Sequence, residues 1–124
     1  MKARPRILVI DDSDDARAAF ATVLQLEGFT VEEARDGREG LEKAAQSPPD
    51  IIITDLRMPV MDGCEMIRRL RADHRTRRIL IIVCSGEERP GKEYTPADAF
   101  VSKPCPLDLL LLEVHGVLRR RAAA

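Results

Sequence analysis

The chain lacks the features that membrane, disulfide-rich and zinc-binding proteins need. Its 124 residues include no tryptophan and only three cysteines, which cannot all pair and do not have the spacing of zinc ligands. We therefore expect reduced thiols in a cytoplasmic protein. No apolar segment approaches the roughly 20 residues that a membrane-spanning helix needs, so we expect no membrane insertion.

A surplus of charge of one sign is also missing. The 20 basic and 21 acidic residues give a formal net charge of -1. This balance does not favour direct binding to nucleic acid or to an anionic membrane. The length suits one domain with one core, and the chain shows no repeat, low-complexity tract or linker. We predict a single domain over residues 1–124.

Five short strand-like runs alternate with helical patterns. The runs are Ile7–Asp11, Thr30–Ala34, Ile51–Asp55, Ile79–Ser85 and Ala99–Ser102. Helical patterns follow the first three runs, and a last one covers Leu107–Arg121. This alternation predicts right-handed βα units and a parallel sheet covered by helices.

Capping residues and turn formers mark the helix boundaries. The first helix should be capped by Ser13 or Asp14 and should stop at Gly28. The second helix should end at Ser47–Pro49, and the third should open at Asp62–Gly63.

The stretch between Ser85 and Phe100 is unsuited to a regular helix. It reads GEERPGKEYTPADA and contains Pro90, Gly91 and Pro96. Proline removes a donor and clashes within a helix, and glycine costs about 1 kcal/mol relative to alanine. We predict one turn or an ordered loop there.

Acidic residues stand at the ends of two of the predicted buried strands. Asp11 and Asp12 close the first run, and Asp55 closes the third. In open α/β sheets the ligand crevice lies at the carboxyl ends of the strands. Three carboxylates that converge there would bind a hard divalent cation.

Three further motifs, taken together with these acidic residues, are similar to those of a known protein family. The third run continues into TDLRMPVMDG, Ser85 ends the fourth, and Lys103–Pro104 follows the fifth. Together these motifs resemble the receiver domain of bacterial response regulators, from Ile7 through the last helix. The resemblance implies a flavodoxin-like, doubly wound, five-stranded parallel sheet of order 2-1-3-4-5 with helices on both faces. The fourth helix of that fold would here be short or irregular.

The resemblance also implies the chemistry of the site. Asp55 would accept a phosphoryl group from a histidine kinase or phosphotransfer protein, in a reaction that depends on Mg2+. Asp12 and Asp55 would bind the ion directly, Asp11 mainly through water, and Arg57 through its backbone carbonyl. Lys103 would pair with the phosphoryl oxygens. No other cofactor is implied.

Four further positions would carry the signal or set its lifetime. Ser85 would bind the phosphoryl group, and Phe100 would be either a switch residue or a core residue. Arg57 and Glu87 would either form an ion pair that shields the acyl phosphate or remain independent, solvated side chains. The resemblance also allows a cis peptide bond between Lys103 and Pro104.

Several classes of protein remain open on these residues. The first is a single-domain response regulator, no enzyme beyond its own phosphorylation and slow dephosphorylation, that engages an unknown downstream protein. The others are a receiver excised from a larger regulator and a phosphorylation-independent pseudo-receiver. A haloacid-dehalogenase-like phosphatase is disfavoured, since it needs a second aspartate where this chain has Arg57.

Other features are less informative. Six arginines between Arg68 and Arg78 indicate either a solvated helix end or a basic face for an acidic partner. His74 and His115 are interpreted as bystanders. The last helix has more leucine than one buried face needs, so some should be exposed and could form a homodimer or partner contact.

Overall fold

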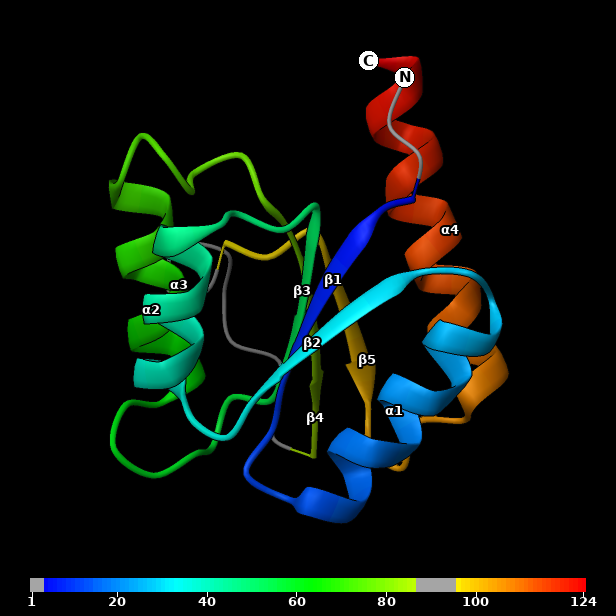
Figure 1. Cartoon of the computed structure of the whole chain (residues 1–124), viewed down its shortest axis with the longest axis horizontal. Coiled ribbons are helices and arrows are strands. Elements are labelled where there is room, and N and C mark those ends of the chain that lie inside the picture. Colours follow the sequence, from blue (N-terminus) through cyan, green and yellow to red (C-terminus); the bar gives the residue numbers. More distant parts are fainter. Residues whose placement is uncertain (1–3, 87–95) are drawn as a thin grey trace.

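The computed structural model describes residues 4–86 and 96–124. Strands and helices alternate along most of the chain (Figure 1). In order they are β1 (Arg6–Ile10), α1 (Asp14–Leu26), β2 (Thr30–Ala34), α2 (Gly37–Gln46), β3 (Ile51–Thr54), α3 (Gly63–Ala72), β4 (Leu80–Ser85), β5 (Ala99–Ser102) and α4 (Leu107–Ala123).

All five strands form one parallel sheet of order β2-β1-β3-β4-β5. The central strands are apolar along almost their whole length, as expected of strands that helices cover on both faces. In the register, Ile7 lies between Val31 of β2 and Ile51 of β3. The predicted fold class and strand order are therefore confirmed.

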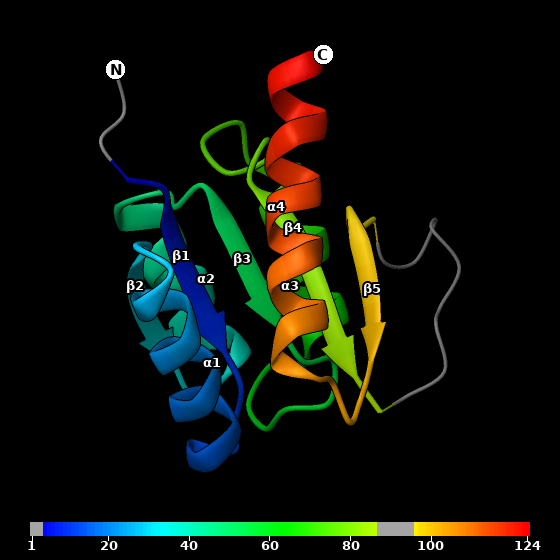
Figure 2. The same ribbon diagram turned by 90° about the vertical axis from the view of Figure 1, so that its right-hand side faces the viewer.

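The helices form one layer on each side of the sheet. Figure 1 shows α2 and α3 on one face, and Figure 2 shows α1 and α4 in front of the other. Successive side chains of β1 pack on opposite faces of the sheet. Val9 belongs to the core that contains Leu24 and Val114, and Leu8 belongs to the core that contains Met66. This alternation places two apolar cores around the sheet, in which β3 and β4 are buried along their whole length.

The predicted helix boundaries are largely confirmed. The Ser13 side chain caps α1 by accepting from the Ala16 amide at 3.2 Å, and Gly28 follows the helix with a φ of 98° that favours glycine. Asp62 caps α3 by accepting from the Glu65 amide at 2.8 Å.

The irregular segment predicted between β4 and β5 falls mostly on residues 87–95, which lie outside the described residues. The described ranges contain four helices. None of these four combines the length and the apolar character that crossing a membrane requires.

Candidate functional site

The carboxyl edge of the sheet brings together side chains that are far apart in the sequence. Asp11 directly follows β1, Asp55 directly follows β3, and Lys103 directly follows β5. The backbone continues the sheet pairing at each position, because Asp55 donates its amide to the Ile10 carbonyl and Lys103 donates its amide to the Ser85 carbonyl. The positions of these side chains therefore follow from the strand register.

Three carboxylates form a compact cluster at this edge. Asp11, Asp12 and Asp55 each offer one oxygen, and these oxygens lie within 4.8 Å of one another. Asp11 is buried with 2% of its surface exposed, whereas Asp12 is exposed to solvent. An all-oxygen set with one open, solvated side suits a hard cation that keeps part of its water shell. The three residues thus fit Mg2+.

Lys103 binds two of these carboxylates. Its Nζ lies 2.9 Å from Oδ2 of Asp11 and 2.7 Å from Oδ2 of Asp55. Burial lowers the pKa of the Lys103 ammonium, but the hydrogen bonds to Asp55 and Asp11 outweigh that effect and raise its pKa above the ordinary value. Lys103 therefore stays positively charged and offsets part of the negative charge of the cluster.

Backbone amides hold the remaining carboxylate oxygens. Oδ1 of Asp55 accepts from the amides of Leu56 at 2.6 Å and Arg57 at 3.3 Å, and Oδ1 of Asp11 accepts from the amide of Ser13 at 2.9 Å. These contacts orient both side chains before any ligand arrives. No residue type in the sequence signals them, because the donors belong to the backbone.

Gly63 is a residue of the site that the sequence indicated only as a helix start. Its amide donates to the Leu56 carbonyl at 2.7 Å, and a Cβ at this position would overlap the carbonyl oxygen of Asp55. The amino terminus of α3 can therefore approach the backbone of Asp55 closely only because residue 63 lacks a side chain.

Ser85 and Phe100 lie where the sequence placed them, on β4 and β5. Ser85 ends β4 and is buried. Phe100 is half-buried, pairs in register with Val83, and packs against the core beneath α2 and α3. Their roles in signalling stay predictions.

The structure describes only one member of the residue pair expected to control the lifetime of the acyl phosphate. Arg57 is exposed beside Asp55. Glu87 lies outside the described residues, so the Arg57–Glu87 ion pair stays a prediction. The peptide bond between Lys103 and Pro104 is cis.

The remaining sequence features are resolved as follows. The three cysteines are free thiols, and burial raises the pKa of Cys84 to about 12. His115 contacts Glu27 and Phe29 rather than the acidic cluster. As predicted, part of the leucine surplus of α4 is exposed, with Leu112 at 64%.

The interpretation of the arginine-rich segment as a solvated helix end is wrong for Arg71. Its guanidinium reaches back over the sheet edge and donates to three carbonyl oxygens and to Asp98. Arg71 joins α3 to the residues before β4 and β5, which the sequence pattern could not show.

Comparisons with known proteins agree with this geometry. Residues 7–115 match the model of the response regulator receiver domain. The chain is 37% identical over 121 residues to the transcriptional regulatory protein PrrA of Mycobacterium leprae, covering 96% of this chain and 52% of PrrA. It is 38% identical over 117 residues to the response regulator MprA of Mycolicibacterium vanbaalenii, covering 93% and 51%. Among solved structures, the chemotaxis response regulator CheY4 of Vibrio cholerae superposes with a TM-score of 0.86 at 33% identity, covering 93% of this chain and 99% of that one.

Proposed function

The chain belongs to the response regulator receiver domain family, and we propose that Asp55 is the residue that accepts its phosphoryl group. Receiver domains are signalling modules of two-component systems rather than conventional enzymes. The observation that carries the proposal is the position of Asp55, with one oxygen on the Lys103 ammonium and the cluster of Asp11 and Asp12 beside it.

The proposed reaction uses Asp55 as a nucleophile. A carboxylate oxygen attacks the phosphorus of a phosphohistidine on a histidine kinase or phosphotransfer protein. The bond from phosphorus to the histidine nitrogen breaks, and an acyl phosphate remains on Asp55. The amides of Leu56 and Arg57 hold the carboxylate in place during the attack.

Receiver domains bind Mg2+ at an acidic pocket, and we assign that pocket here to Asp11, Asp12, Asp55 and the backbone carbonyl of Arg57. When bound, the ion supplies positive charge that offsets the carboxylates and the phosphoryl oxygens. Asp12, which is exposed, and Asp55, which is partly buried, would bind it directly. Asp11, held by Ser13 and Lys103, would act mainly through water.

Lys103 has a separate part in the proposed reaction. Its ammonium is bound by Asp11 and Asp55 before transfer, and it would pair with oxygens of the transferred phosphoryl group afterwards. The Lys103 amide donates to the Ser85 carbonyl, so a movement of Lys103 would also shift the neighbouring strands β4 and β5. Ser85 ends β4 and Phe100 lies on β5, and these two residues would carry the change to a partner surface.

The downstream partner is proposed only as a class. The chain spans about half the length of the curated relatives it matches, and the names of those relatives describe transcriptional regulators and response regulators. We propose that residues 1–124 form one receiver domain that engages a protein partner in the cytoplasm, without direct contact to nucleic acid. Exposed leucines of α4 make a homodimer an option for that contact.

The proposal is tested by incubating the protein with acetyl phosphate and Mg2+ and measuring its intact mass. We expect a phosphoryl adduct that chelator prevents and that Asp55→Asn abolishes. The matched control is Asp15→Asn, which removes an exposed carboxylate from the first turn of α1. An unmodified wild-type mass here and with a histidine kinase would indicate a phosphorylation-independent binding module instead.

A further inference from the structure

A basic hollow lies at the edge of the sheet opposite to Asp55. It is formed by the end of α3, the residues before β4, the residues before β5 and the end of α4, and its volume is about 840 Å³. Residues that precede parallel strands meet at the amino edge of the sheet, whereas Asp11, Asp55 and Lys103 follow their strands. Figure 1 shows the end of α4 beyond that amino edge. The hollow is thus separate from the acidic cluster.

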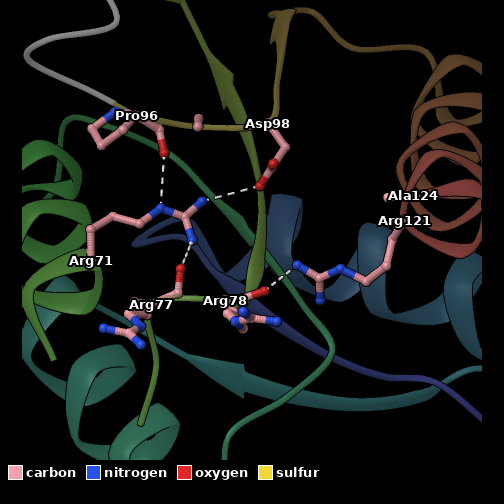
Figure 3. Close-up of a pocket in the computed structure, with 8 residues that line it drawn as sticks. Arg71, Arg77, Arg78, Pro96, Asp98, Arg121 and Ala124 are labelled. Carbon is pink, nitrogen blue, oxygen red and sulfur yellow. Dashed lines mark hydrogen bonds and ion pairs between the residues drawn. The ribbon is translucent and has the colours of Figure 1, made fainter. Parts of the chain in front are cut away.

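Arg71 and Asp98 build the back wall of the hollow (Figure 3). The Arg71 guanidinium donates to the carbonyls of Pro96 at 3.0 Å, Arg77 at 2.7 Å and Ile79 at 2.7 Å, and to Oδ2 of Asp98 at 3.1 Å. The same Asp98 oxygen accepts from the Ile81 amide at 2.8 Å. Arg71 and Asp98 therefore neutralise each other. Both side chains are also fixed by backbone groups, Arg71 by three carbonyls and Asp98 by the Ile81 amide.

Three further arginines line the hollow, and in the part of the chain that the structure describes they have no acidic partner. Within residues 4–86 and 96–124, no carboxylate forms an ion pair with Arg77, Arg78 or Arg121. Arg121 reaches across from α4 and donates to the Arg78 carbonyl (Figure 3).

Nearby arginines of the same segment are paired. Arg68 and Arg69 bind Glu65, and Arg75 binds Asp73. Within the described residues, the arginines of this segment that lack an ion pair are Arg77 and Arg78, and both line the hollow. Ala124 also lines the hollow, and even a terminal carboxylate there would leave an excess of positive charge among the lining residues that the structure describes.

We propose that this hollow binds the diphosphate group of a small phosphorylated molecule. Arginine presents a planar fork of donors that matches phosphate oxygens. Three arginines that have no ion pair within the described ranges line one hollow, and they favour an anion with several charges over a single carboxylate. The hollow falls within the size range of small-molecule sites. Among residues 4–86 and 96–124, no aromatic side chain lines it, as base stacking by single-stranded nucleic acid would need.

The test is isothermal titration calorimetry with inorganic pyrophosphate and, separately, with adenosine diphosphate. Chelator is present so that no metal bridges phosphate to the acidic cluster, and salt is kept at about 0.1 M to screen loose surface attraction. We expect saturable one-to-one binding that Arg77→Gln/Arg78→Gln weakens by about tenfold or more. Arg71 is left unchanged because it holds the wall.

Two control variants make the result specific. Arg35→Gln/Arg38→Gln removes two exposed arginines that follow β2 at the other edge of the sheet, and should bind as wild type does. Asp55→Asn should also bind as wild type does, since the hollow is separate from the acidic cluster. Tighter binding of the nucleotide would identify a nucleoside diphosphate as the ligand, and equal binding would identify the diphosphate group alone.

Three results would overturn the proposal. The first is an absence of saturable binding, and the second is an unchanged affinity in Arg77→Gln/Arg78→Gln. The third is a control variant that loses as much affinity as Arg77→Gln/Arg78→Gln does.

Discussion

Nζ of Lys103 lies 2.7 Å from Oδ2 of Asp55, although 48 residues separate the two in the chain. Lys103 follows β5 and Asp55 follows β3, and β4 lies between these strands in the sheet. The lysine side chain thus reaches across the carboxyl end of β4 to the acidic cluster. Because Asp11 accepts from the same ammonium, one cation holds two carboxylates that would otherwise repel each other.

Lys103→Met should destabilise the protein most in the absence of metal. The change keeps most of the side-chain length but leaves Asp11 and Asp55 without their cation, at a cost of about 1–3 kcal/mol. We expect urea unfolding in chelator to show this loss and added Mg2+ to reduce it. Lys43→Met is the matched control, because within residues 4–86 and 96–124 the Lys43 ammonium binds a backbone carbonyl, that of Glu33, and no carboxylate. Equal losses in the two variants would contradict the stabilising role of Lys103.

Gly63→Ala should destabilise the fold through the backbone of Asp55. The added Cβ would overlap the Asp55 carbonyl oxygen and move either α3 or the backbone at Asp55 and Leu56, at a cost of about 1–3 kcal/mol. Gly116→Ala is the control, since its Cβ meets only the flexible end of Arg120 and gains helix propensity. Thermal unfolding should show a lower midpoint for the first variant and an unchanged or higher one for the second.

Asp73 should titrate well below an ordinary aspartate. The side-chain hydrogen bonds of Arg75 lower the pKa of Asp73 from 3.8 to about 2. Since the folded pKa is the lower one, this contact stabilises the fold fully above pH 3.8 and is lost as the pH falls through about 2. Arg75→Gln should bring the pKa of Asp73, followed by carboxyl NMR signals, back toward 3.8. Arg77→Gln should leave it unchanged, and a pKa that stays low without Arg75 would contradict this assignment.

Cys84 should resist alkylation in the native protein. Only the thiolate reacts, and burial raises the pKa of Cys84 to about 12. With iodoacetamide at about pH 8, peptide mass spectrometry should find Cys84 unlabelled while the half-buried Cys64 reacts, and both labelled in denaturant. Fast labelling of native Cys84 would show that this end of β4 opens readily.

The predictions from sequence succeeded where residue type and strand position together determine the outcome. Asp11, Asp55 and Lys103 are charged residues that directly follow apolar strands, so a parallel sheet must bring them to one edge. The strand limits shifted by about one residue, since β1 begins at Arg6 and β4 at Leu80.

Features that depend on backbone partners could not be predicted in this way. Arg71 binds three carbonyl oxygens, and carbonyl groups are the same in every residue. Gly63 matters because of the close approach of Asp55, which appears only when α3 and β3 are placed in three dimensions. The sequence therefore favoured a solvated helix end for the whole arginine-rich segment, although Arg71 is hydrogen-bonded at the amino edge of the sheet.

The most direct test of this account is to locate the phosphoryl group. After reaction with acetyl phosphate and Mg2+, borohydride reduces an aspartyl phosphate to homoserine, and tandem mass spectrometry identifies the position. The account predicts homoserine at residue 55 and at no other aspartate, with none formed in chelator. Homoserine at another aspartate, or a phosphoryl adduct that survives Asp55→Asn, would contradict it.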